Sequence, residues 1–225
     1  MRLWIRLAVL CCLAATPALA VGPIDGEVNA LWWVNDTDVD TPGGSASGDG
    51  DAPGLRAEMW LFGRYGIRAA QFSSDVDEFG IDDSNDYTSV DLLWKAFAPT
   101  EHNFVAVGAG YEEMDLGLLG LDGDTWSTRL AVEGRVGFIG AVYGYLQGAY
   151  LPTIDDTSSV VPTVEFEDMD GYEYEMGVSW KFAPFVSLRA GYRETSIDFT
   201  QTDGLTDFDG TAESTGFVAG LGVHF

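Results

Sequence analysis

The feature that most constrains this chain is its last segment, residues 214–225, in which apolar side chains alternate with small or weakly polar ones. The apolar positions are Phe217, Ala219, Leu221, Val223 and Phe225. A period of two is that of a β-strand, because successive side chains point to opposite faces of a sheet. One face of this strand therefore lies in an apolar medium, and the sequence stops on an aromatic ring without a polar tail.

Residues 1–20 have the organisation of a secretory signal peptide. A positive start at Arg2 and Arg6 precedes an apolar run that is too short to span a bilayer, and Ala18-Leu19-Ala20 is a small-x-small cleavage site. We therefore expect a signal peptide at 1–20 and a single mature domain at 21–225.

Both cysteines, Cys11 and Cys12, lie in the predicted signal, so the mature chain has neither a thiol nor a disulfide. A lipid anchor on one of them is the alternative. It is disfavoured because the residue before each cysteine, Leu10 or Cys11, is not the small one that lipid-anchor processing prefers.

After the signal, the chain keeps nine of its 11 basic residues and all 36 acidic ones, which gives a net charge of −27. This charge suits cationic partners and excludes nucleic acid. No segment approaches the ~18 consecutive apolar residues of a membrane helix, so insertion into a membrane has to use strands. Because lipid offers no partner to a free backbone N–H or C=O, the strands have to close into a barrel.

Short period-two segments rich in aromatic residues and glycine alternate with tight turns and longer acidic segments, which is typical of a membrane β-barrel. We predict an all-β, antiparallel up-and-down barrel of ten strands. The strands are residues 26–34, 55–62, 67–73, 87–97, 103–111, 125–136, 141–151, 171–182, 186–196 and 214–225. Eight strands are the alternative, if residues 26–34 and 67–73 are loop.

Charge is distributed unevenly between the predicted strands and loops. Five long segments carry 27 of the 36 acidic residues and none of the nine mature basic ones: residues 35–53, 75–86, 112–124, 152–170 and 198–213. Long loops of such barrels face the outside and short turns face the periplasm. The sequence therefore predicts acidic extracellular loops.

A short motif occurs twice, each time before a predicted periplasmic turn: Trp94-Lys95-Ala96-Phe97-Ala98-Pro99 and Trp180-Lys181-Phe182-Ala183-Pro184. Its aromatic residues suit the membrane–water interface, and its proline suits a turn.

Twelve charged residues alternate with apolar ones within the predicted strands. A charge on the lipid face near the bilayer centre costs ~2–4 kcal/mol for Arg or Lys, so the alternation directs these side chains into the lumen. They are Arg56, Glu58, Asp91, Lys95, Arg129, Glu133, Arg135, Glu173, Glu175, Lys181, Arg189 and Arg193. Bulky Trp33, Trp60 and Phe62 are expected to point inward as well.

Two interpretations of this charged interior stay open. A salt-bridge network that fills a narrow barrel is the main one, because buried charges need partners. A narrow porin-like channel for small ions or solutes is the alternative.

Clustered carboxylates in the acidic segments are weak candidate ligands for a hard cation, Ca²⁺ or Mg²⁺. They are Asp36, Asp38, Asp40, Asp122, Asp124, Glu167, Asp168, Asp170, Asp207 and Asp209. None forms a complete calcium-loop motif. A solvated, self-repelling cap is the main interpretation, and divalent cations that bridge to lipopolysaccharide phosphates are the alternative. No other cofactor is expected.

No enzymatic activity is expected. The two histidines, His102 in a predicted periplasmic turn and His224 beside the C-terminus, both belong to the periplasmic end. Neither can reach a site that the outer loops would build, and neither has a serine or aspartate at hydrogen-bond spacing.

The signal peptide, the alternating strands, the acidic outer segments and the Phe-ended last strand together resemble small Gram-negative outer-membrane β-barrel proteins, the superfamily that includes OmpA-like membrane domains. The resemblance implies location in the bacterial outer membrane, contact with its lipid and lipopolysaccharide, and insertion by the barrel-assembly machinery. It also implies an assembly signal at Phe217, Leu221, Val223 and Phe225. We expect a monomer with either a structural or surface-interaction role, or a narrow channel.

Overall fold

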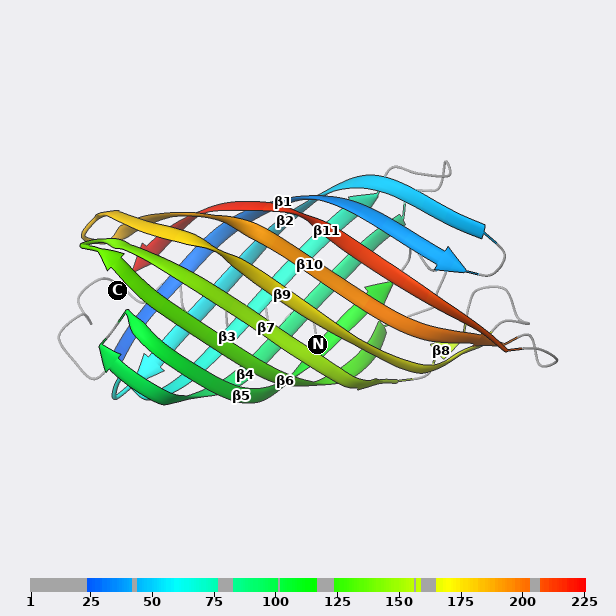
Figure 1. The fold of residues 1–225 in the computed structure, drawn as a ribbon, viewed down its shortest axis with the longest axis horizontal. Helices are drawn as coiled ribbons and strands as arrows, with labels where there is room; N and C mark the ends of the chain where they lie inside the picture. The colour runs from blue at the N-terminus through cyan, green and yellow to red at the C-terminus, as the bar shows by residue number, and fades with distance from the viewer. Residues whose placement is uncertain are drawn as a thin grey trace.

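The barrel is known from a computed structural model, which describes residues 24–41, 44–76, 83–100, 102–116, 124–155, 157–158, 165–202 and 207–225. These residues form a closed, all-antiparallel barrel of ten tilted strands (Figure 1). The strands are β1 (Ile24–Thr41), β2 (Gly44–Leu61), β3 (Tyr65–Val76), β4 (Asp83–Thr100), β5 (Asn103–Leu116), β6 (Asp124–Ile139), β7 (Val142–Ile154), β9 (Glu165–Ala183), β10 (Val186–Thr202) and β11 (Asp207–His224). A two-residue strand, β8 (Thr157–Ser158), pairs with β9.

Pairing between β1 and β11 closes the barrel, from Glu27 opposite His224 to Asp40 opposite Thr211. The prediction of ten strands is confirmed. The eight-strand alternative is wrong, because residues 26–34 and 67–73 lie in β1 and β3. No helix long and apolar enough to cross a membrane is found in the described part of the chain.

The strands are longer than predicted. Six of them have 17 to 19 residues, whereas a membrane-spanning strand needs only ~9–11. The extra length comes from the acidic segments. Residues 35–53, predicted as a loop, are strand wherever the structure describes them, with β1 and β2 paired out to Thr41 opposite Gly44. The long-loop prediction is wrong here because the ladder satisfies the backbone to the tip of the hairpin.

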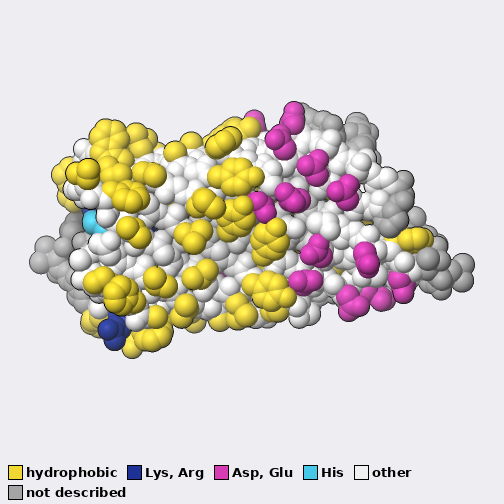
Figure 2. Space-filling view, viewed as in Figure 1, with side chains coloured by type: hydrophobic (Ala, Val, Ile, Leu, Met, Phe, Trp, Pro, Cys, Tyr) yellow, Lys and Arg dark blue, Asp and Glu magenta, His cyan; other side chains and the backbone are white. Residues whose placement is uncertain are grey.

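The outward face changes from apolar to acidic along the barrel axis (Figure 2). On β1, Trp32 and Val34 are exposed, and the next outward positions are Asp36 and Asp38. The apolar part is the band that lies against lipid, and the acidic part extends beyond it. Short turns at residues 62–64, 140–141 and 184–185 mark the opposite, periplasmic end.

The interior is charged where the outer face is apolar, and apolar where the outer face is acidic. It has three layers along the barrel axis. A basal cluster lies nearest the periplasm and consists of Trp60, Leu93, Phe104, Ala106 and Ala131. A layer of charged residues follows, and above it is an apolar core that contains Leu31, Trp33, Phe72, Met114, Leu151, Ile154, Phe166, Met169, Ile197, Phe199 and Val218. Strand β2 crosses all three layers, with Trp60 in the first, Glu58 and Arg56 in the second, and Ala52 in the third.

The apolar core makes the extracellular part of the barrel resemble a water-soluble protein, with an apolar interior and an acidic exterior. The part within the membrane is inverted, with a charged interior and an apolar exterior. Trp33 and Trp60 point inward as predicted and are buried. Phe62 does not: it lies in the β2–β3 turn with a φ of 53° and is 74% exposed, so its inward prediction is wrong.

Candidate functional site: the charged interior of the barrel

The charged layer consists of six arginines and seven carboxylates that pair across the lumen. Its arginines are Arg56, Arg68, Arg129, Arg135, Arg189 and Arg193. Its carboxylates are Glu27, Glu58, Asp91, Glu112, Glu133, Glu173 and Glu175. Each of these six arginines has a carboxylate oxygen within 4.0 Å. Below we call this set the ionic layer.

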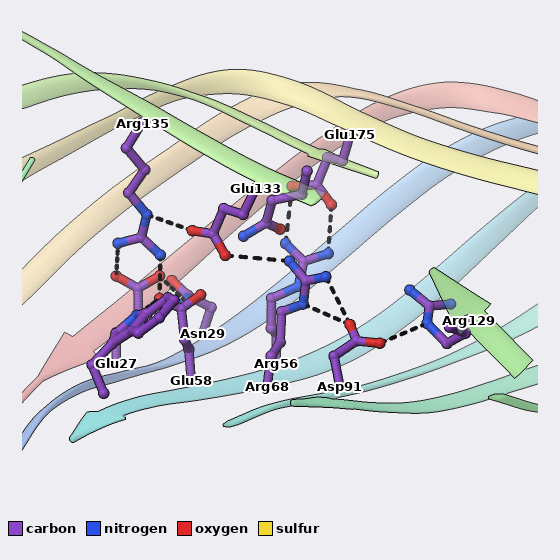
Figure 3. A network of polar contacts seen from close by, with 12 residues as sticks. Glu27, Asn29, Arg56, Glu58, Arg68, Asp91, Arg129, Glu133, Arg135 and Glu175 are labelled. Carbon is purple, nitrogen blue, oxygen red and sulfur yellow. Dashed lines mark hydrogen bonds and ion pairs between the residues drawn. The ribbon is translucent and has the colours of Figure 1, made fainter. Parts of the chain in front are cut away.

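Asp91 on β4 is the junction of one group (Figure 3). Arg68 donates to Asp91 at 2.7 Å and lies 3.3 Å from Glu133. Arg129 donates to the other Asp91 oxygen at 3.0 Å, and its remaining nitrogens contact Glu112 and Glu173. One aspartate thereby joins strands β3 and β6 through two guanidinium groups.

A second group centres on Glu175 of β9. Arg56 of β2 binds it through two hydrogen bonds of 2.7 and 3.2 Å, and Arg189 of β10 donates to it at 3.0 Å. Arg189 also donates to Gln147. The Arg56–Glu175 pair joins strands that are not neighbours in the barrel wall, so it crosses the lumen.

A third group lies toward the periplasm around Arg135. This arginine contacts Glu58 at 2.6 Å, Glu133 at 2.7 Å and Glu27 at 3.6 Å. Glu133 also pairs with Arg68, so the third group is continuous with the first. Buried ion pairs contribute little net stability, but removing one partner costs several kcal/mol because the other charge is left unpaired.

Ten of the twelve predicted lumen residues are buried in the interior. Glu173 also belongs to the ionic layer, and its side chain keeps 13% exposure. Lys181 differs from the ten because it is only half-buried, at the periplasmic mouth of the barrel. Lys95 is buried but packs on aromatic rings, with its ammonium 4.0 Å from the Trp60 ring centroid and 4.1 Å from that of Phe104.

Three charged members of the ionic layer were not among the predicted twelve: Glu27, Arg68 and Glu112. Glu27 is an even number of positions from inward-facing Trp33 on β1, and Arg68 is an even number of positions from inward-facing Phe72 on β3. Strict alternation would therefore have placed both side chains in the lumen. Glu112 fell in a predicted loop, whereas β5 continues through it to Leu116.

The described residues of the ionic layer enclose two small cavities. One cavity of about 20 Å³ lies among Arg56, Glu112, Arg129 and Glu173, and a second of about 20 Å³ lies among Glu27, Glu58, Lys95 and Arg135. A cavity of ~10–15 Å³ on this scale holds one water molecule. The interior therefore has room for isolated waters beside the ion pairs.

The candidate metal ligands are spread over the extracellular exterior. Asp36, Asp38, Asp40, Glu167, Asp168, Asp207 and Asp209 are exposed, and Asp170 is half-buried. Asp122 lies outside the described residues, and Asp124 begins β6. Among the residues whose placement is described, no group of three or more His, Cys, Asp or Glu side chains is arranged to hold a metal ion.

Both histidines lie at the periplasmic end. His102 stacks on Tyr143 with ring centroids 5.5 Å apart, and His224 lies 2.9 Å from the Ser187 hydroxyl and 3.6 Å from Glu27. The chain has no other histidine, so no imidazole lies at the extracellular end.

No protein-family model matches this chain. No curated protein matches it either. Among solved structures, the outer-membrane protease OmpT of Escherichia coli is similar at 10% identity, covering 94% of this chain and 99% of OmpT, with a TM-score of 0.56. Neisserial surface protein A (15% identity, 91% and 98% coverage, TM-score 0.39) and OprG of Pseudomonas aeruginosa (14%, 91% and 96%, 0.39) are further matches.

At these identities the comparison shows the fold alone. The similarity to OmpT, an outer-membrane protein, and the closed ten-strand topology of this chain confirm the predicted outer-membrane β-barrel fold. The chain is an outer-membrane β-barrel protein with ion pairs inside the barrel.

Proposed function

We propose that this outer-membrane β-barrel is closed to ions and solutes and that its role is structural, exerted at the cell surface. The apolar core carries the proposal. Trp33, Phe72 and Met114 are 0 to 1% exposed, and together with their neighbours they fill the interior between the ionic layer and the extracellular end. An ion that crossed this core would lose its hydration and would meet no charged side chain among the core residues, only neutral groups beside them such as the hydrogen-bonded hydroxyls of Thr37 and Ser214.

The ionic layer supports the same proposal. A conducting lumen needs charged side chains that face water, whereas the arginines here are held by carboxylates of other strands. Arg193 also connects the two layers, because its guanidinium lies 4.3 Å from the Phe72 ring centroid and 5.2 Å from that of Trp33. Conduction would require both layers to rearrange together.

Single-channel recording of the refolded mature protein in a planar bilayer tests this proposal. We expect no stable openings from protein whose folded state is shown by its resistance to SDS at room temperature. Stable, cation-preferring openings would overturn the proposal in favour of the narrow porin-like channel. Asp91, Glu133, Glu173 and Glu175 would then be the residues to neutralise as candidate filter groups.

A second component of the proposed function is contact between the acidic exterior and the outer leaflet, mediated by divalent cations. Asp36 lies directly opposite Asp49, and Asp38 directly opposite Glu213, on the exposed face of the sheet. Like charges in directly opposite positions destabilise a sheet. A Ca²⁺ or Mg²⁺ ion shared with lipopolysaccharide phosphates would offset this repulsion, and the acidic residues begin where the apolar band ends (Figure 2).

Protease resistance of the β1–β2 hairpin in lipopolysaccharide-containing vesicles tests the cation contact. We expect Ca²⁺ to slow cleavage relative to Na⁺ at equal ionic strength, and the Asp36→Asn/Asp49→Asn variant to remove the difference. Asp25→Asn is the matched control, because Asp25 is an exposed aspartate at the periplasmic end of the same strand. Identical digestion with both salts would contradict the cation contact and leave the closed-barrel proposal intact.

We propose no enzymatic role. The protease activity in OmpT's name belongs to a protein that shares only its fold with this chain. The positions of His102 and His224 support the absence of an imidazole-dependent site at the cell surface.

A further inference from the structure

The periplasmic end of the barrel contains a cavity of about 630 Å³, far larger than the spaces in the ionic layer. Apolar side chains form part of its wall, among them Ile24, Phe185 and Phe225. Its polar lining includes both lysines of the chain, Lys95 and Lys181. Binding sites for small organic molecules have volumes of ~300–1,000 Å³ and combine apolar walls with a few polar groups.

The repeated motif of the sequence places both lysines at this cavity. In each copy the tryptophan faces the lipid, with Trp94 45% and Trp180 50% exposed, and the next residue is the lysine on the opposite face. The first copy ends β4 and the second ends β9, so the two lysines approach the cavity from different strands. The motif therefore does more than supply interfacial aromatic residues.

The lysines differ from the interior arginines in their partners. Every arginine of the ionic layer has a carboxylate oxygen within 4.0 Å, whereas the described residues provide no such partner for Lys95 or Lys181. Lys95 is only 4% exposed. Its ammonium lies against the faces of Trp60 and Phe104, which favour a cation but donate no counter-charge.

No described carboxylate pairs directly with the Lys95 ammonium, although Asp25 and Glu58 line the small cavity beside it, so the aromatic faces and these more distant charges restore its lost hydration only in part. An anion that entered the cavity would supply the missing partner at the base, and Lys181 at the mouth would add a second positive charge. Asp25 and the terminal carboxylate of Phe225 also line the cavity and balance the two lysine charges, so an anion would be held by direct contact with the lysines and not by a net positive charge.

We infer that the periplasmic cavity is a binding site for an organic anion. The carboxylate or phosphate group would pair with Lys95 and Lys181, and the apolar body would pack on Phe185 and Phe225. The site opens away from the cell surface and lies below the ionic layer, so it stands whether or not the closed-barrel proposal holds.

The two lysines allow a direct test by NMR. Reductive methylation with ¹³C-formaldehyde labels Lys95, Lys181 and the α-amino group of the folded mature protein, and dimethylation keeps the positive charge. We expect titration with phenyl phosphate to shift both lysine resonances along saturable curves with one common Kd. Inorganic phosphate should saturate more weakly, and phenyltrimethylammonium should cause no saturable shift. Linear shifts with all three probes, or shifts of the α-amino signal alone, would overturn the inference.

Three variants separate a built site from general attraction of anions. Lys95→Gln and Lys181→Gln should each weaken phenyl phosphate binding about tenfold, which is the loss of one charged hydrogen bond. Arg64→Gln is the matched control, because it removes a positive charge from an exposed turn at the same end of the barrel and should leave the Kd unchanged. If Lys95→Gln fails to fold, Lys181→Gln carries the test. Equal weakening by Arg64→Gln would overturn the inference.

Discussion

Gly26 and Phe225 join the first and last strands of the barrel through two backbone hydrogen bonds, each 3.0 Å long. The ring of Phe225 covers the glycine: a Cβ placed on Gly26 would lie 2.6 Å from the ring Cζ. The terminal aromatic therefore has a fitted surface on β1, and that surface exists only because residue 26 has no side chain. The seam of the barrel is closed at its periplasmic end by this pair.

We predict that Gly26→Val lowers the amount of folded protein in the outer membrane, as Phe225→Asp does. The valine side chain would displace the ring from the seam, and the aspartate would remove the ring. The measurement is the fraction of heat-modifiable, folded protein in membrane fractions. Gly134→Val is the control, because a Cβ at Gly134 has no neighbouring atom closer than 4.0 Å. Normal levels of Gly26→Val would show that the packing of Phe225 on Gly26 does not matter for assembly.

Arg129 contacts three carboxylates, Asp91, Glu112 and Glu173, so its loss leaves several negative charges without this partner. We predict that Arg129→Met lowers the free energy of unfolding in lipid vesicles by about 3–5 kcal/mol, the cost of breaking a buried ion pair on one side. Urea titration followed by tryptophan fluorescence measures it. Arg64→Gln, at an exposed turn, should change the free energy by less than about 0.5 kcal/mol. Equal effects of the two substitutions would contradict a paired interior.

Alternation in the sequence was sufficient to predict which face of most strands is inward. The charges of β2 and β6, such as Arg56 and Arg129, follow from one rule, that a charge on the lipid face is costly. The number of strands follows from the same pattern. The rule applies only within strands, and the predicted fifth strand ended at residue 111. Glu112 was missed because β5 continues beyond that residue.

The apolar core could not be predicted, because the sequence does not mark where the membrane ends. Beyond that level the two faces of each strand exchange their polarity while the period of two continues. Asp36-x-Asp38-x-Asp40, whose spacing made these residues candidate metal ligands, is the outward half of an alternating strand whose inward half includes Thr37. The sequence also could not predict that Lys95 packs on Trp60 and Phe104, because these two rings come from different strands.

Adjacent tryptophans on β1 test the apolar core. Trp33 is fully buried in it and packs edge-to-face on Phe72, with ring centroids 6.2 Å apart, whereas Trp32 is 50% exposed on the outer face. We predict that Trp33→Ala destabilises the barrel by about 3–5 kcal/mol through loss of burial and creation of a cavity. Trp32→Ala should cost clearly less. Chemical denaturation in vesicles measures both, and a larger loss for Trp32→Ala would contradict a packed core at this level.

The β1–β2 hairpin should lose stability as pH rises. The side-chain hydrogen bond between Asp36 and Asp49 needs a proton, and together with their mutual repulsion it raises the pKa of Asp36 above its ordinary value of 3.8. The folded hairpin therefore binds this proton more tightly than the unfolded chain does, so its stabilising effect is complete below pH 3.8 and is lost as pH rises through the higher folded pKa. Hydrogen-exchange protection factors of the hairpin amides, corrected for intrinsic rates, measure the effect.

Asp36→Asn is the decisive variant for this prediction. The amide can donate to Asp49 at any pH, so the protection factors of the variant should stay level between pH 4 and pH 7 while those of the wild-type hairpin fall. Asp25→Asn, at the other end of β1, should leave the wild-type trend in place. Protection that rises with pH in the wild-type protein would mean that the two carboxylates are not held together, and the argument for a shared divalent cation at this pair would lose its basis.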